Sequence, residues 1–146
     1  MERCETDTQP DPEFAELLQR FCGRTVASVW FSDYSVLYLE FGEVIDSRPN
    51  HPKHEQAIFA GYDWSLRLGD GVVVDRLDRD DHLVENQLMG QSVLSISLTI
   101  DNELLVAFAS GSRLESRSDT GEPPGWDVRE GLRCAWIKEN RCHVEG

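Results

Sequence analysis

Two histidines and a carboxylate stand close together in the segment His51-Pro52-Lys53-His54-Glu55. Imidazoles three positions apart could bind one metal ion from the same face of a helix. Pro49 and Pro52 disfavour a helix here, because proline lacks an amide donor and clashes with the preceding turn. We therefore interpret 47–55 as a solvated loop and not as a metal site.

A cluster of acidic residues further along the chain could hold a divalent cation through oxygen ligands. It consists of Asp75, Asp78, Asp80, Asp81 and Glu85. The central glycine of a calcium-binding loop is missing, and two arginines interrupt the run. Asp80 and Asp81 suit the start of a helix, where negative charge is favoured. The run as a whole suits an acidic patch that faces a basic partner.

The four cysteines are Cys4, Cys22, Cys134 and Cys142, and none of them forms a Cys-x-x-Cys pair. The first residues are acidic and lack the apolar segment of a secretory signal, so we expect free thiols. Cys134, Cys142 and His143 could meet as metal ligands, but a buried small side chain at Cys134 and a loose C-terminal tail are the simpler interpretation. We predict no metal and no cofactor.

No nucleophile elbow, phosphate-binding loop or dinucleotide fingerprint occurs in the sequence. The serines are numerous, but none stands in a recognisable nucleophile context. We therefore predict a protein that is not an enzyme.

Acidic residues outnumber basic ones by 27 to 14, which gives a formal net charge of −13 over 146 residues. This charge argues against nucleic acid and against anionic membrane surfaces as partners. No apolar run approaches the ~18 residues of a membrane span. We expect a cytoplasmic protein whose partner, if charge guides binding, is basic; the charge could equally serve solubility alone.

The elements that would position these residues are two helices and several short strands. Asp11-Pro12 predicts a helix start, apolar spacing continues it, and Gly23 ends it. A second helix is predicted from Asp80 to Met89, before Gly90. Alternation predicts strands over 25–31, 37–41, 43–46, 62–68, 72–75, 92–100, 104–108 and 113–116, with Gly69-Asp70-Gly71 as a tight turn.

Alternation also assigns side chains to the two faces of these strands. Ala27, Val29 and Phe31 are expected to face the core, which leaves Trp30 and Tyr38 on the outer face of the first hairpin. Leu94, Ile96, Leu98 and Ile100 are expected to share one face of a later strand. Exposed aromatic residues are typical of interfaces; alternatively, this face packs against another part of the chain. Trp126 and Trp136 are expected to cover the end of the second of two lobes.

The two halves of the chain show an internal repeat with an offset of 67 residues, since 90 − 23 = 67. Identical pairs are Gly23 and Gly90, Val26 and Val93, Ser28 and Ser95, Leu37 and Leu104, and Phe41 and Phe108. Gly61-Tyr62-Asp63-Trp64 is echoed by Gly125-Trp126-Asp127-Val128 at an offset of 64, since 125 − 61 = 64. The alternative to duplication is that the two stretches are unrelated and share only a common order of helix, turn and strands.

We therefore predict an α+β, mostly antiparallel β fold. A flexible acidic tail, 1–10, precedes a single domain, 11–146, made of two similar lobes at about 11–79 and 80–146. Each lobe would hold a short helix followed by a β-hairpin and further short strands.

The segments 88–93, 105–114 and 125–128 combine a helix end, a glycine, a valine-rich strand, a Phe-x-x-Gly-x-x-Leu strand and a Trp-bearing strand. In this they resemble small, uncharacterised bacterial two-lobed proteins that look like immunity proteins of toxin systems, and 63–67 fits the same scheme. The resemblance implies a small acidic protein that binds one toxin. The family ending reads Glu-x-Trp, whereas Gly125 precedes Trp126 here, and no functional residue can be transferred.

The leading hypothesis is a non-enzymatic, immunity-type inhibitor that covers a basic toxin or another basic protein. Its expected surface consists of Trp30, Tyr38, Asp75, Asp78, Asp80 and Asp81. The alternative is a small-molecule-binding protein or enzyme with a cleft between the lobes, for which His51, His54 and Cys134 are the first suspects. Self-association through the exposed hairpin face is a third hypothesis.

Overall fold

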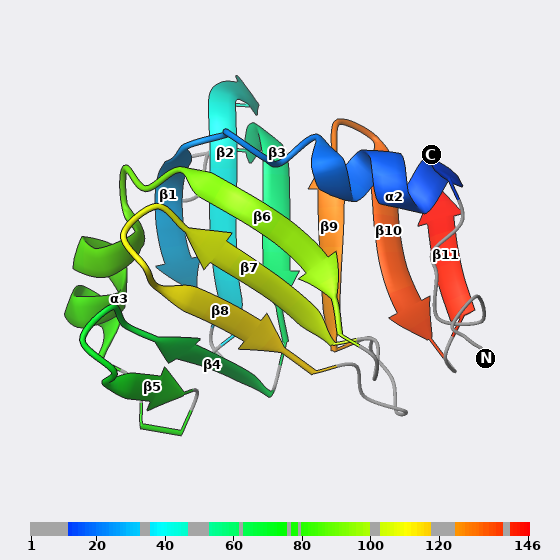
Figure 1. Ribbon diagram of the computed structural model, residues 1–146. Coiled ribbons are helices and arrows are strands. Elements are labelled where there is room, and N and C mark those ends of the chain that lie inside the picture. Colours follow the sequence, from blue (N-terminus) through cyan, green and yellow to red (C-terminus); the bar gives the residue numbers. More distant parts are fainter. Residues whose placement is uncertain are drawn as a thin grey trace.

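The computed structural model describes residues 12–32, 36–46, 53–61, 63–75, 77–78, 80–99, 103–117, 125–138 and 141–146, and the expected tail 1–10 lies outside them. Two antiparallel sheets pack face to face, with two short helices beside them (Figure 1). The predicted class, mostly antiparallel β with short helices, is confirmed. No helix within these ranges has the length and apolar character needed to cross a membrane.

The larger sheet has six strands in the order β1-β2-β3-β9-β10-β11. The predicted hairpin of β1 and β2 is present, and residues 43–46 continue β2 instead of forming a separate strand. The interpretation of 53–55 as loop is wrong, because β3 begins at Lys53; β3, β10 and β11 were not predicted. The strands are β1 (Val26–Phe31), β2 (Leu37–Asp46), β3 (Lys53–Ala60), β9 (Trp126–Glu130), β10 (Arg133–Lys138) and β11 (Arg141–Glu145).

The smaller sheet has five strands in the order β5-β4-β8-β7-β6. All five were predicted from alternation and turn residues. Gly71 adopts a φ of +94° in the turn between β4 and β5, a conformation that glycine reaches without strain. The strands are β4 (Trp64–Arg67), β5 (Val73–Asp75), β6 (Val93–Leu98), β7 (Leu104–Phe108) and β8 (Arg113–Ser116).

Both helices begin close to the predicted positions, and α3 also ends close to its predicted end, whereas α2 ends at Gln19, about one turn before Gly23. α2 (Pro12–Gln19) buries Phe14, Leu17 and Leu18 and contacts β6, β9 and β11. α3 (Asp81–Leu88) packs against β1. The Asp80 carboxylate accepts a hydrogen bond from the Leu83 amide at 3.1 Å, which confirms the predicted N-cap.

The core fills the space between the two sheets. Trp64 and Trp126 are both buried there, and Trp126 meets Phe14 of α2 edge-on with ring centroids 6.1 Å apart. The expectation that Trp126 covers the end of the second lobe is therefore wrong. Among the described residues, the apolar core forms one cluster that takes side chains from both sheets and both helices.

β-bulges overturn part of the predicted face assignment. The pairing of β1 with β2 shifts between Val26 and Ser28, and that of β6 with β7 shifts between Val93 and Ser95. A bulge adds one residue to a strand and reverses the alternation before it. Val26 and Val93 are therefore buried, whereas Ala27, expected on the core side, and Leu94, expected to share a face with the buried Ile96, are exposed.

The segments 11–79 and 80–146 do not correspond to separate sheets. β4 and β5, from the first segment, extend the sheet of β6, β7 and β8, while β9, β10 and β11 extend the sheet of β1, β2 and β3. Each sheet thus needs strands from both segments, so the two segments are not independent packing units.

The two segments also meet through a short symmetric contact that joins the sheets. Thr25 and Ser92 form an isolated antiparallel bridge. Around it the backbone hydrogen bonds come in matched pairs: Gly23 N to Val93 O (2.8 Å) with Gly90 N to Val26 O (3.0 Å), and Val93 N to Arg24 O with Val26 N to Gln91 O (both 2.9 Å). Within each pair, the two donor residues are 67 positions apart in the sequence, and so are the two acceptor residues. This is the offset of the predicted repeat.

Strand pairing identifies further equivalent positions. Trp64 of β4 lies opposite Ser116 of β8, and Trp126 of β9 lies opposite Ala60 of β3. By strand pairing, Trp126 holds the position in the larger sheet that Trp64 holds in the smaller one, at a separation of 126 − 64 = 62 residues. The echo at an offset of 64 instead aligns Trp64 with Val128, so the strand pairing does not reproduce it.

Candidate protein-binding surface

The outer face of the six-stranded sheet, the face turned away from the core, bears a continuous row of side chains. Cross-strand partners place one residue from each strand in this row. Four of the six are Trp, Tyr or Phe, and we call the set the aromatic row. In sheet order, its members are Trp30, Tyr38, Phe59, Asp127, Trp136 and His143.

A second row lies beside the first on the same face, and each of its members is two positions away from the aromatic-row residue of the same strand. It consists of Ser28, Glu40, Ala57, Arg129, Cys134 and Glu145. Trp30 and Tyr38 were predicted to lie on this outer face, and their position is confirmed. Trp136, expected to cover the end of the second lobe, lies on this face toward its β11 side. The remaining residues of the two rows belong to strands that were not predicted or to β9. The register of β9 could not be predicted from the sequence.

Trp30, Tyr38 and Phe59 form a compact aromatic group. The Trp30 and Tyr38 rings are parallel, with centroids 3.9 Å apart, and Phe59 meets Tyr38 edge-on at 5.1 Å. Trp30 Nε1 donates to Glu40 Oε2 at 2.7 Å, and the His54 amide donates to Glu40 Oε1 at 3.0 Å. Glu40 is only 6% exposed, so these two donors satisfy a carboxylate that water reaches poorly.

Asp127 and Arg129 form an ion pair in the middle of the face. Arg129 donates to both carboxylate oxygens, at 2.9 Å and 3.2 Å, and its guanidinium lies 5.9 Å from the Phe59 ring centre. Burial raises the pKa of Asp127, and the attraction of Arg129 offsets this only in part. Burial also raises the pKa of Tyr38, so its hydroxyl remains a neutral donor.

The far end of the face, on β10 and β11, carries Trp136, His143 and Cys134. The Trp136 and His143 rings are stacked, with centroids 5.4 Å apart and planes 10° apart. Burial, helped by the charge of Asp127, raises the pKa of the Cys134 thiol to about 11. Cys134 is therefore a protonated thiol at neutral pH and a poor nucleophile.

The outer face of the five-stranded sheet provides an internal comparison, because its strands pair in the same pattern. Its rows are Ser97, Leu105, Glu115, Ser65 and Asp75, and Ser95, Ala107, Arg113, Arg67 and Val73. Serine and leucine stand where the other face has Trp30 and Tyr38, as the repeat predicts, and Glu115 stands where it has Phe59. A sheet of this construction therefore does not require aromatic residues on its outer face.

The predicted aspartates lie elsewhere. Asp75 ends β5, Asp80 caps α3, Asp81 opens that helix, and Asp78 lies between them. Asp75 Oδ1 accepts a hydrogen bond from the Asp78 amide at 2.8 Å. The structure thus places the aspartates at the edge of the five-stranded sheet, away from the face that holds Trp30 and Tyr38, and it does not combine the six residues into one cluster.

The residues considered for a site in a cleft between the lobes, His51, His54 and Cys134, are not brought together among the described residues. His51 lies outside the described residues. His54 is on β3, where its Nδ1 lies 2.9 Å from the Gly42 carbonyl oxygen, and Cys134 is on β10. The space between the sheets is filled by apolar side chains, which argues against a polar cleft there.

The proposed trio of Cys134, Cys142 and His143 is separated by the alternation of β11. Cys142 packs toward the core, whereas its neighbour His143 points to the outer face. Within the ranges that the structure describes, no three His, Cys, Asp or Glu side chains are grouped to hold a metal ion.

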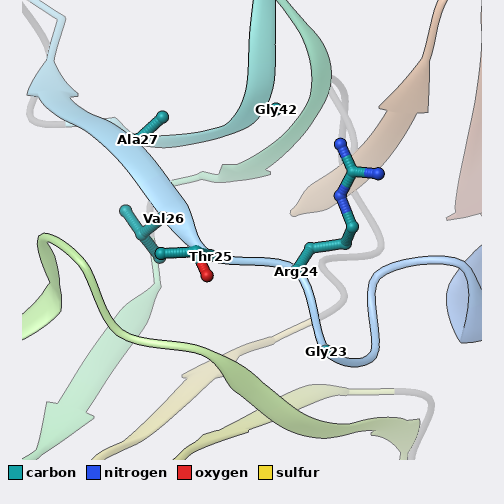
Figure 2. A pocket seen from close by; sticks show the side chains of 6 residues that line it. All are labelled: Gly23, Arg24, Thr25, Val26, Ala27 and Gly42. Carbon is teal, nitrogen blue, oxygen red and sulfur yellow. The ribbon is translucent and has the colours of Figure 1, made fainter.

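Two hollows lie close to Arg24. The first, of about 400 Å³, is bordered by Gly23, Arg24, Thr25, Val26, Ala27 and Gly42, and Figure 2 shows the Arg24 side chain extending along it toward Gly42. The second, of about 370 Å³, is lined by Arg20, Arg24, Ile45, Glu55, Gln56, Glu130 and Gly131. Its two arginines are already paired, Arg20 with Glu130 at 2.6 Å and Arg24 with Glu55 at 3.3 Å. Neither hollow contains His54 or Cys134.

No protein-family model, no curated protein and no solved structure matches this chain. The assignment of a function therefore depends on the geometry of the molecule itself.

Proposed function

We propose that this chain is a non-enzymatic binding protein that recognises a protein partner through the outer face of the six-stranded sheet. The observation that supports this most strongly is the difference between the two outer faces. One bears Trp30, Tyr38, Phe59 and Trp136, and the equivalent positions of the other bear small, aliphatic or charged residues. Aromatic and arginine side chains are the usual anchors of protein interfaces.

The arrangement of the rings favours a protein over a flat ligand or a sugar. Trp30 and Tyr38 each turn one ring face toward the other, since they lie parallel at 3.9 Å, and Phe59 meets Tyr38 edge-on. A stacking ligand needs an exposed ring face, whereas a protein surface can pack against ring edges and the apolar area around them. The Asp127–Arg129 pair adds polar groups that could orient a partner.

The net charge of −13 supports a basic partner, because opposite charge speeds association and disfavours acidic competitors. With the resemblance to immunity proteins, this leads us to propose an immunity-type inhibitor that acts in the cytoplasm and covers the active surface of a basic toxin. The aspartates near β5 and α3 would contribute to the attraction at a distance.

We further propose that the fold arose by duplication of one helix-and-strands unit followed by exchange of strands between the copies. The matched hydrogen bonds around Thr25 and Ser92 support this, as do the bulges at equivalent positions of β1 and β6. Under this proposal the aromatic row is a specialisation of one copy.

The test is an affinity capture from the host lysate with three tagged chains. Wild type and Leu105→Ser, a change on the polar outer face, should retain the same dominant basic protein, and Trp136→Ser should lose it. The purified partner should then bind the wild type in titration calorimetry, more weakly as salt is raised. Equal retention by all three chains would show that the aromatic row is not the binding surface.

A further inference from the structure

Among the described residues, β5 is one of the two edge strands of the five-stranded sheet, with β6 at the other edge (Figure 1). Its equivalent in the larger sheet is β10, because β5 pairs with β4 as β10 pairs with β9. β10 is itself covered by β11, which pairs with it over five positions. In the part of the chain that the structure describes, the smaller sheet has no strand at the place that β11 fills in the larger one.

The surroundings of this edge are unusually apolar for an exposed strand. Val72 and Val73 are each about half exposed, and Leu77, just beyond the strand, is 84% exposed. Natural edge strands are usually protected by charge, by proline or by a covering element, because their free amides and carbonyls invite pairing. Exposed valines beside such groups suit an added strand, whose side chains would pack against them.

The charges near the edge indicate what kind of strand would be added. Asp70 precedes β5, Asp75 ends it, Asp78 follows, and Asp80 and Asp81 lie at the start of α3. Arg67 of β4 lies opposite Val73 and offsets one of these five carboxylates, so four negative charges remain, since 5 − 1 = 4. A segment with lysine or arginine among apolar residues would complement this edge, and an acidic segment would be repelled.

A second copy of this chain fits the edge less well. β5 is only three residues long, so antiparallel pairing of two β5 strands about Val74 would place Asp75 of each copy opposite Val73 of the other, with the two Asp75 carboxylates on a diagonal of the same face. Like charges in neighbouring strands are destabilising. The chain's own first residues are acidic and would meet the same repulsion.

We propose that the β5 edge is a docking site for an extended, basic segment of a partner protein, which adds to the five-stranded sheet as its sixth strand. Backbone hydrogen bonds to β5 would hold the segment, Val72 and Val73 would pack against its apolar residues, and the aspartates would pair with its cations. This site lies on the opposite sheet from the aromatic row and does not depend on it.

The test uses the full chain and a peptide of alternating lysine and valine, with an alternating glutamate and valine peptide as the charge control. Binding of the lysine peptide should protect the β5 amides from hydrogen exchange and should weaken as salt is raised. Val73→Lys should weaken it by about tenfold or more, because an edge lysine opposes pairing and repels the peptide. Leu94→Lys, which adds the same charge to the exposed far edge of the same sheet, should have little effect.

Several results would overturn the proposal. One is equal binding of the two peptides, another is equal weakening by the two lysine variants, and a third is protection that appears on strands other than β5. Concentration-dependent dimerisation of the wild type that Val73→Lys abolishes would identify a second copy as the occupant instead. Trp136→Ser should bind the lysine peptide normally, which separates this site from the proposed function of the outer face.

Discussion

Thr25 and Ser92 lie opposite each other at the junction of the two sheets, with their hydroxyl oxygens 3.4 Å apart. Each residue lies two positions beyond a glycine with positive φ, +81° at Gly23 and +77° at Gly90. The amide of each glycine donates to the opposite chain segment, to Val93 O and to Val26 O respectively. The two glycines therefore have the same task on the two sides of the junction.

Gly23→Ala and Gly90→Ala should each lower the free energy of unfolding by about 1 kcal/mol or somewhat more, because an L-residue in the left-handed region is strained. A Cβ at either position would meet no atom within 4 Å, so backbone strain is the only expected cost. Urea unfolding of both variants measures this. Losses that differ strongly between the two would contradict the equivalence of the glycines.

Trp30→Phe should lower the free energy of unfolding by about 1–3 kcal/mol, because it removes a donor from a buried carboxylate. Glu40 would keep only the donor from the His54 amide. The loss should shrink in a Glu40→Gln background, since a neutral amide needs the donor less. Trp136→Phe, whose ring stacks on His143, serves as the control and should cost less. Urea unfolding of wild type, the two single variants at Trp30 and Glu40 and the double variant measures the coupling between the two side chains. An equal loss on Trp30→Phe in the wild-type and in the Glu40→Gln background would contradict this coupling.

Leu39→Ala should cost about 2–5 kcal/mol, as is usual when a fully buried leucine leaves a cavity. Leu94→Ala should change stability by less than about 0.5 kcal/mol, because Leu94 is 64% exposed at the bulge of β6. Thermal and urea unfolding of the pair distinguish the two expectations. A large loss at Leu94 would mean that the bulge is misplaced and that the simple alternation holds.

The buried Asp127 carboxyl predicts a pH dependence of stability. Its folded pKa is raised above the ordinary value of 3.8, so the unfolded chain releases this proton before the folded protein does. The contribution of Asp127 to stability should therefore fall as the pH rises through the window between those two values, and stay level above it. Asp127→Asn should abolish this fall.

The measurement is the free energy of unfolding of wild type and Asp127→Asn from acid to neutral pH. The stability of the variant relative to wild type should rise with pH across the window. Asp78→Asn, which removes an exposed carboxylate, controls for the change in net charge. A relative stability of Asp127→Asn that falls with pH would contradict the raised pKa.

The Cys134 thiol should react slowly with iodoacetamide at neutral pH, because its pKa of about 11 leaves little thiolate. The rate should rise about tenfold for each pH unit below that value. Peptide mapping by mass spectrometry follows the site directly. Rapid alkylation at neutral pH would contradict the burial of this thiol and would reopen it as a nucleophile.

Several parts of this structure could be predicted from local sequence alone. Asp80 and Gly90 mark the ends of α3, because capping groups act within one turn of the chain. The hairpins of β1 with β2 and of β4 with β5 follow from alternation and short turns. The outward position of Trp30 and Tyr38 also follows from alternation, since neighbouring side chains of a strand point to opposite faces.

Other features depend on pairing between distant segments and could not be predicted. The bulges that bury Val26 and expose Leu94 arise from the register with the next strand, which periodicity does not contain. β3 could not be recognised in the sequence because its start closely follows two prolines. Its central place in the sheet is decided by pairing with β2 and β9.

By itself, the sequence determined the acidic charge, the two short helices, most of the short strands and the outer position of one aromatic pair. These follow from interactions within a few residues. Only the tertiary structure decided that each sheet combines strands from both segments, and that Asp127, Trp136 and His143 extend the row begun by Trp30. The reason is that register between distant strands, such as that of Ile58 with Val128, 128 − 58 = 70 residues apart, is chosen by the packing of the whole core, to which every strand contributes.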